Sequence, residues 1–369
     1  MQYNDRWKKL RKIMHSILNN RQTEVYKPFQ DLESRQLLHD YLQTPKEWYT
    51  ANGRFANSVI MSVVFGRRSI LGDPATAELF RTMEDFLRET QPGANMVDAY
   101  PVLNGLPRFL QWWRHRGEEI FRRTRACYKR EVDLIKAKQT AGTQKDCFTV
   151  EFLKQCEKEK DLDETARLFA LGSLMEAGSD TSKVSICQII AGACTYPDWV
   201  PRARKELDAV CVVKEGFRWR PNIAEIGAPT VLIKDDEYEG YKFPAGTVFT
   251  WNAWAIALNP NEYEEPERFW PERFLNADLR NPLKGHYAFG PGRRVCSGWN
   301  VGECNVFIAI ARLLYCFDFE EVKGQPIDTM TIPQFTGGKD PFKLNIKVRS
   351  EAHARLIERE CSAAVTHEY

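Results

Sequence analysis

The stretch that decides the fold runs from Ala288 to Gly298 and reads Ala-Phe-Gly-Pro-Gly-Arg-Arg-Val-Cys-Ser-Gly. It holds one cysteine, Cys296, in a glycine-rich loop directly before an apolar segment with helical spacing. Glycine removes side-chain bulk, so a flat ligand can approach the backbone at Gly292 and Gly298. The positive end of the following helix dipole is expected to lower the pKa of Cys296 and to favour its metal-binding thiolate. Arg294 can pair with an anionic group beside it.

On these residues alone, two interpretations of the loop remain open. One is a site for a thiolate-ligated cofactor that carries acidic substituents. The other is an ordinary glycine-rich turn before a helix, which a lone motif of this kind favours. The rest of the chain has to decide between them.

The loop resembles the haem-binding signature of cytochromes P450, F-x-x-G-x-R-x-C-x-G, at every fixed position. The resemblance implies that Cys296 is the axial thiolate ligand of the iron of haem b and that Arg294 holds a haem propionate. It also places Phe289, Gly292 and Gly298 in the cofactor-binding loop. A thiolate ligand favours O–O cleavage in such a haem.

A second motif, Glu215-Gly216-Phe217-Arg218, resembles the E-x-x-R of the same family. Residues three apart share a helix face, so Glu215 and Arg218 can pair. The resemblance adds Arg273 of Pro271–Phe274 as a third member of a buried network. Buried charges persist only when paired, so we expect a structural role beneath the haem pocket.

A third motif, Ala177–Thr181, resembles the oxygen-activation motif A/G-G-x-D/E-T. By that resemblance Gly178 opens space above the iron, and Asp180 and Thr181 are the catalytic residues that relay protons. On residue pattern alone, a solvated polar patch on a helix is the commoner explanation, and Cys296 downstream tips the balance towards function.

Trp7 and Arg11 resemble the W-x-x-x-R of the family's C helix, whose members contact a haem propionate. Their spacing of four residues places both side chains on one helix face. A solvated basic face is the plainer interpretation of this pair when it stands alone.

Composition bounds the function classes. The 369 residues are 43% hydrophobic and 12% aromatic, which excludes a disordered chain. With 52 Lys+Arg against 50 Asp+Glu, there is no charge footprint for nucleic acid. The ten cysteines include no C-x-x-C, so we expect reduced thiols, and the six histidines show no zinc-ligand spacing. No apolar stretch is long enough to predict a transmembrane span.

Hydrophobic periodicity predicts a mainly α fold with small β-sheets (α+β), and the resemblance makes it the cytochrome P450 fold in one incomplete domain over residues 1–369. Residues 1–220 are expected to be mostly helical, and residues 221–369 to hold small sheets, coil, the haem loop and its helix. A helix of about 30 residues ending near Tyr196 contains Gly172, Gly178 and Gly192, which predicts close backbone contacts there. Further helices are predicted over Asp5–Asn19, Ser34–Gln43, Glu47–Gly66, Pro74–Thr90, Phe109–Thr140 and Gly298–Phe317, and strands over Thr230–Ile233, Tyr241–Phe243 and Thr247–Trp251.

The resemblance also marks departures from the family. The chain is expected to begin at the C helix, without the membrane anchor, the first helices, part of the N-terminal sheet and the B–C loop. A second gap is expected where Val210–Lys214 bridges directly to Glu215. Pro229-Thr230 stands where relatives often have Pro-His or an arginine. A truncated gene model, a splice variant or a decayed copy would each explain the gaps, and Thr331–Gly338 is the remaining candidate for a substrate loop.

The resemblance implies a haem-thiolate monooxygenase that inserts one atom of O₂ into a small apolar substrate, in fungal secondary metabolism. Electrons would come from NADPH through an NADPH–cytochrome P450 reductase. Charge alone suggests that this reductase docks on Lys8, Lys9, Lys12 and Arg293. The family belongs to the cytosolic face of the endoplasmic reticulum membrane, and its members are membrane-anchored, whereas this chain as given also suits the cytosol.

Two alternatives stay open. The first is a catalytically inactive, truncated P450-like protein that binds a ligand or has no function. The second is a thiolate-haem isomerase or dehydratase that needs no reductase. The intact motif Ala177–Thr181 argues against the second, because such enzymes need no proton relay to dioxygen.

Overall fold

The structure is a computed structural model that describes residues 4–18, 24–70, 73–90, 94–159, 162–206, 209–222, 229–330 and 340–367. The chain folds into two compact units, residues 57–177 and residues 1–56 with 178–368. Two helices, α4 (Trp48–Phe65) and α9 (Glu164–Thr195), belong partly to each unit. The predicted loop Thr331–Gly338 lies outside the described residues.

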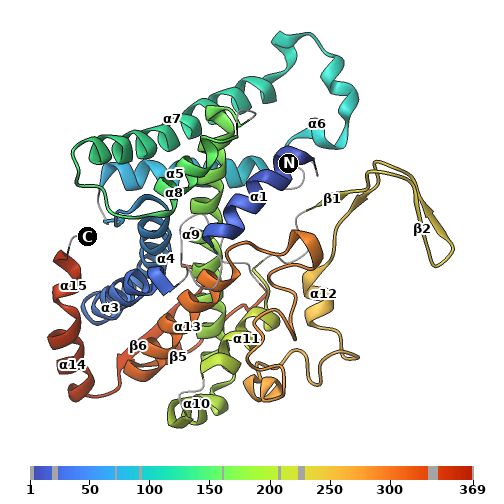
Figure 1. The fold of residues 1–369 in the computed structure, drawn as a ribbon. Coiled ribbons are helices and arrows are strands. Elements are labelled where there is room, and N and C mark those ends of the chain that lie inside the picture. Colours follow the sequence, from blue (N-terminus) through green and yellow to red (C-terminus); the bar gives the residue numbers. More distant parts are fainter. Residues whose placement is uncertain are drawn as a thin grey trace. The chain divides into compact units, whose positions relative to one another are not determined.

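The described chain is mainly helical and carries three small sheets, which confirms the expected fold class (Figure 1). The predicted helix Phe109–Thr140 begins later, at Trp112, because residues 108–110 form a separate 3₁₀ turn. The remaining α-helices are α1 (Asp5–Ile17), α3 (Lys27–Gln43), α5 (Pro74–Thr90), α6 (Met96–Ala99), α7 (Trp112–Thr140), α8 (Phe148–Cys156), α10 (Val200–Glu206), α11 (Ala209–Trp219), α12 (Ala253–Ala257), α13 (Trp299–Cys316), α14 (Glu351–Cys361) and α15 (Ala363–Thr366). Short 3₁₀ turns are η1 (Glu24–Tyr26), η2 (Pro45–Glu47), η3 (Pro101–Gly105), η4 (Arg108–Leu110), η5 (Pro197–Trp199), η6 (Pro271–Phe274) and η7 (Gly292–Arg294).

Side-chain caps fix where three of these helices begin. Asn4 Oδ1 accepts a hydrogen bond from the backbone N–H of Trp7 at the start of α1. Asp163 Oδ1 accepts one from Ala166 at the start of α9. Ser350 Oγ accepts one from His353 at the start of α14. Each cap satisfies a backbone donor that the first helical turn leaves without an intrahelical partner.

All three sheets are antiparallel pairs in the unit that holds residues 178–368. The β2–β3 hairpin is almost fully exposed and projects from the rest of its unit (Figure 1). The predicted strands Thr230–Ile233 and Thr247–Trp251 are shorter than expected. The pairs are β1 (Thr230–Val231) with β4 (Val248–Phe249), β2 (Asp236–Tyr238) with β3 (Tyr241–Phe243), and β5 (Phe317–Glu321) with β6 (Leu344–Val348).

Helix α13 is central to the packing of the larger unit, where it lies against α3 and α11. Gln30 of α3 donates to the side chain of Asn305 (2.7 Å) and to the carbonyl of Val301, both on α13. Arg312 of α13 bonds in return to Ser34 of α3. Because α13 follows Cys296 directly, this packing anchors one end of the cysteine loop.

Close backbone contacts explain two of the three interior glycines that the sequence singled out, Gly172 and Gly192. In the smaller unit, a Cβ atom at Gly172 would lie 2.1 Å from the ring of Tyr128. In the larger unit, a Cβ at Gly192 would lie 2.4 Å from the ring of Phe269. The same holds for Gly216 of α11, where a Cβ would lie 2.2 Å from Ile189 of α9. These distances are too short for any side chain, so α9 and α11 pack more closely than larger residues would allow.

Among the described residues, no helix is both long enough and apolar enough to cross a membrane. Large apolar side chains nevertheless gather at the surface between Met96 and Trp112. Val102 is 83% exposed and Phe109 is 78% exposed. Such a run is unusual for a monomer in water, where large apolar patches mark interaction surfaces.

Candidate functional site

The cysteine loop closes on its own backbone. The N–H of Cys296 donates to the carbonyl of Phe289 (2.8 Å), and the N–H of Val295 donates to the carbonyl of Gly292. Gly292 has φ +66°, a left-handed conformation that favours glycine. The loop therefore presents Cys296 in a fixed position just ahead of α13.

Four residues from two distant stretches of sequence meet beside this loop; we call them the Arg11 cluster: Trp7, Arg11, Arg294 and Cys296. Arg11 of α1 donates from Nη2 to the carbonyl of Val295. The guanidinium of Arg294 lies over the ring of Trp7, 4.1 Å from its centroid. The structure thus brings together four of the seven residues that the sequence assigned to cofactor binding.

Arg11 is incompletely bonded in this cluster. Its Nε is buried and has no hydrogen-bond partner among the described residues. Burial lowers the pKa of Arg11, the negative charge of a Cys296 thiolate opposes this, and the like charge of Arg294 lowers it further. A guanidinium in this state calls for an anionic acceptor.

The prediction that the loop lowers the pKa of Cys296 is wrong. Burial by the surrounding atoms raises that pKa, and the backbone N–H of Gly298 and the charge of Arg11 oppose the rise without overcoming it. Cys296 nonetheless keeps an exposed surface. In the protein alone the thiol form is therefore favoured, and thiolate formation needs a cation as partner.

The residues present fit a thiolate-ligated haem. Cys296 is exposed, and a Cβ atom added at Gly292 or Gly298 would meet nothing within 4 Å, so there is space beside the thiol. Arg11 has a buried nitrogen without a partner among the described residues, suited to a propionate. A thiolate ligand, space beside the loop and cationic neighbours are the features that such a group requires.

Beneath the loop, three rings form an aromatic cluster that sequence analysis missed. Phe289 packs against Phe217 of α11 at 5.0 Å and against His286 at 5.7 Å between centroids. His286 is buried, and burial together with the charge of Lys214 lowers its pKa to about 3. The neutral imidazole and the ring of Phe217 thus pack against Phe289. The backbone carbonyl of Phe289 accepts the hydrogen bond from the N–H of Cys296.

The predicted trio of Glu215, Arg218 and Arg273 meets in the structure, and we call it the Glu215 network. Both oxygens of Glu215 accept from Arg218 at 2.7 Å, and Arg273 Nε lies 3.3 Å from Glu215 Oε2. Glu215 also accepts from the backbone N–H of Trp270 (2.7 Å). Burial raises the pKa of Glu215, and the two arginines and this N–H oppose the rise. Residues 210–214, interpreted from the sequence as a bridge, belong to helix α11 with Glu215.

Asp180 and Thr181 lie on α9, and Asp180 is not a solvated residue. Its carboxylate pairs with Lys183 one turn later at 2.6 Å. Thr181 is half-buried, and its carbonyl accepts from the hydroxyl of Ser185 (3.0 Å). Sequence analysis missed the partner of Asp180, although a lysine three residues after an aspartate is a signal for a helical ion pair.

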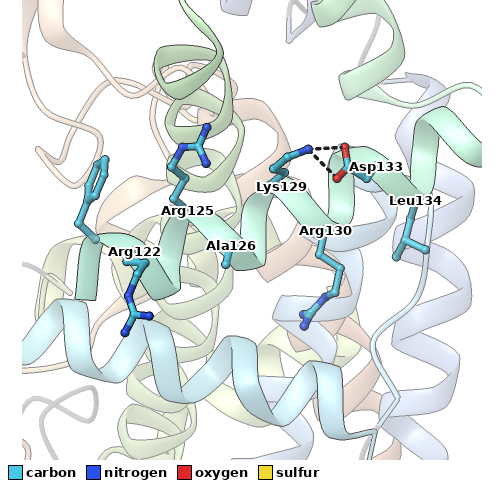
Figure 2. A pocket seen from close by; sticks show the side chains of 8 residues that line it. Arg122, Arg125, Ala126, Lys129, Arg130, Asp133 and Leu134 are labelled. Atoms are coloured by element: carbon cyan, nitrogen blue, oxygen red, sulfur yellow. Dashed lines mark hydrogen bonds and ion pairs between the residues drawn. The ribbon is translucent and has the colours of Figure 1, made fainter. Parts of the chain in front are cut away.

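A groove of about 660 Å³ along α7 is a weaker candidate (Figure 2). Its walls come from one helix, and its charges are matched locally. Lys129 bonds Asp133 at 2.7 Å, as the dashed lines show, and Arg125 and Arg130 pair with Glu164 and Glu78. In the described part of the chain, no group of three or more His, Cys, Asp or Glu is placed to hold a metal ion.

Comparison with known proteins identifies a family. The sequence profile described as cytochrome P450 matches residues 1–346. The cytochrome P450 monooxygenase atE of Aspergillus terreus is 31% identical, over 99% of this chain and 75% of its own length. The monooxygenase verL of Clonostachys rogersoniana is 32% identical over 98% and 73%, and patI of Aspergillus clavatus is 32% identical over 89% and 68%.

Solved structures show the same fold. A zebrafish cytochrome P450 crystallised with abiraterone superposes with a TM-score of 0.71 at 18% identity, over 94% of this chain and 83% of the other. A second structure of a zebrafish cytochrome P450, with progesterone, has a TM-score of 0.73 at 21% identity over the same shares. At these identities the likeness establishes the fold and nothing further.

Proposed function

This chain belongs to the cytochrome P450 family, and from that membership we propose that it is a haem-thiolate monooxygenase whose iron ligand is Cys296. The proposal rests on the Arg11 cluster. There an exposed cysteine and two arginines lie together, beside loop glycines that leave space next to the backbone. The homologues are fungal P450 monooxygenases, so monooxygenation is the activity of the family.

Each residue has one role in this proposal. Cys296 ligates the iron, and Arg11, Arg294 and Trp7 hold the propionates. When bound through a thiolate, the haem supplies the oxygen-activating chemistry, because this ligand favours O–O cleavage. The loop glycines leave room for the macrocycle, and the aromatic cluster keeps the loop rigid.

Proton supply falls to α9 in the same proposal. The carboxyl group of Asp180 accepts a proton and passes it on, and the hydroxyl of Thr181 directs that proton. The Glu215 network takes no part in the chemistry, because its buried charges are bonded to one another and to backbone groups. We assign it the structural support of the site.

Substrate, partner and location follow from the family rather than from contacts. We propose a small apolar organic substrate of fungal secondary metabolism and NADPH as the electron source through a reductase. Basic residues on α1 and η7 beside the site suit an acidic partner: Lys8, Lys9, Lys12 and Arg293. The exposed apolar segment between Met96 and Trp112 supports a location at the cytosolic face of a membrane.

The test is the absorption spectrum of the reduced protein under CO. We expect a red-shifted Soret band of the thiolate type in the wild type, and its loss in Cys296→Ser. Cys304→Ser, on the first turns of α13, is the matched control and should keep the band. Reversal of the four basic residues to Glu should slow reduction by the reductase without changing the CO spectrum.

Absence of the band in the wild type would favour a non-catalytic, P450-like binding protein. A normal band with turnover that does not depend on a reductase would favour an isomerase or dehydratase. Retention of the band in Cys296→Ser would refute the assignment of the ligand.

A further inference from the structure

The carboxylate of Asp180 is held by a nearly buried ion pair. Lys183 Nζ lies 2.6 Å from Asp180 Oδ1, and the two side chains are only 17% and 11% exposed. Exposed helical pairs contribute little because solvent screens them. Here most of the solvent is excluded, so the attraction is stronger and the carboxylate has few other orientations.

Lys183 is in turn held by a second helix, α4. Its ammonium lies 5.0 Å from the ring centroid of Tyr49, within the range of a cation–π contact. Its Cδ lies 3.5 Å from the position of a Cβ at Gly53, one helical turn after Tyr49. This is an ordinary van der Waals distance, so the lysine stem lies along α4 beside Gly53.

The groups that face Lys183 keep it charged. Burial would lower its pKa, but Asp180 first, and then Tyr49 and Cys187, outweigh burial, and the pKa of Lys183 is raised. The lysine is thus a cation beside Asp180 at neutral pH.

We propose that Lys183 is a positioning residue: clamped between Tyr49 and Asp180, it fixes the orientation of the carboxyl group that supplies protons. The inference rests on the proposed function, because it gives Asp180 the role of proton donor. Lys183 itself touches neither substrate nor cofactor in this proposal. It sets the direction that the carboxyl group of Asp180 faces, and so the direction in which the proton leaves.

The experiment compares Lys183→Met, which removes the charge and keeps the length, with Lys183→Arg, which keeps the charge. Reconstituted holoenzyme is supplied with reductase and NADPH, and NADPH oxidation and hydrogen peroxide release are followed against pH and in D₂O. Lys129→Met removes an exposed lysine of a comparable helical pair on α7 and serves as the control.

We expect Lys183→Met to reduce the NADPH oxidation rate about tenfold, a fraction of what a general acid contributes. Its solvent isotope effect should rise, because the released carboxyl group delivers the proton in poorer alignment. Lys183→Arg should recover the rate to within about threefold. Lys129→Met should match the wild type.

A readout without haem completes the test. A double-mutant cycle of Lys183→Met and Asp180→Asn on urea unfolding of the apoprotein should show coupling at pH 7, because either single substitution already breaks the pair. An unchanged solvent isotope effect in Lys183→Met would overturn the inference while the CO spectrum stays normal. A wild type without the CO band would instead refute the proposed function, and this inference with it.

Discussion

Arg218 is fully buried and Arg11 is half-buried, and the protein uses these two arginines in opposite ways. All five N–H groups of Arg218 are bonded within the chain, to Glu215 and to the carbonyls of Ala257, Pro266 and Arg268. Arg11 bonds one carbonyl and leaves a buried Nε without a partner among the described residues. It makes no ion pair with a described carboxylate and faces the like charge of Arg294 instead.

The difference shows how to distinguish an arginine that stabilises the fold from one that is available to bind a ligand. A guanidinium offers five donors, and a structural one uses them all, because a buried unsatisfied donor is costly. In the proposed function, an arginine that the fold leaves partly unbonded beside an exposed cysteine binds a haem propionate. Three substitutions test this comparison.

The largest effect is expected for Glu215→Gln. Gln still accepts from the Trp270 N–H, but it leaves Arg218 and Arg273 buried without a counter-charge. Breaking one side of a buried pair costs about 3–5 kcal/mol, so the urea midpoint of the apoprotein should fall sharply. The exposed Glu262→Gln is the control and should unfold like the wild type. A loss below about 1 kcal/mol would show that the carbonyls alone satisfy Arg218.

A smaller effect is expected from His286, which packs against Phe217 and Phe289. Its pKa is lowered to about 3 in the folded protein by burial and by Lys214, against about 6.5 when unfolded. The unfolded chain therefore binds a proton first, and stability present above pH 6.5 is lost as the pH falls. The loss between pH 7.5 and 5.5 should be about 1 kcal/mol.

Comparison with His286→Gln isolates this contribution. Gln can accept from the Ala288 N–H as His286 Nδ1 does, but it does not titrate. The difference in unfolding free energy between the two proteins should therefore shrink by that amount as the pH is lowered. A difference that stays constant with pH would mean that His286 is protonated in the folded protein.

The smallest effect on stability is expected for Arg11→Met. Removing a partly bonded guanidinium beside a like charge should change the unfolding free energy of the apoprotein by less than about 0.5 kcal/mol. Haem retention should fall about tenfold, equivalent to about 1.4 kcal/mol. Arg355→Met on the exposed face of α14 should retain haem normally. If Arg11→Met instead destabilised the apoprotein as Glu215→Gln does, the contrast between the two arginines would collapse.

The sequence was enough to predict those parts of the site that depend on short spacing. Glu215 and Arg218 are three residues apart on one helix, and the loop around Cys296 is a continuous motif, so local geometry already implies their neighbours. The meeting of Trp7 and Arg11 with Arg294 came from the family resemblance, because α1 and the loop lie at opposite ends of the sequence. No periodicity encodes a contact of that kind.

What sequence could not supply is solvent exposure. The helix dipole argument for Cys296 considered the backbone alone, and burial by surrounding atoms proved larger and raised the pKa. The role of His286 depends on the rings of Phe217 and Phe289, which only packing brings to it. Lys183 could have been found from its spacing to Asp180, but its contact with Tyr49 belongs to the tertiary structure.

The glycines at 192 and 216 have a consequence at the level of the gene. Any missense change in a glycine codon adds a Cβ atom, and at both positions that atom would overlap a neighbouring side chain. These two codons therefore have no mild amino-acid replacement, whereas a Cβ atom at Gly105 or Gly117 would meet nothing nearby. In a library of random nucleotide changes selected for folding, the first two codons should tolerate only synonymous mutations. Missense mutations at these two codons should therefore be depleted more strongly than those in the strands of the exposed β2–β3 hairpin.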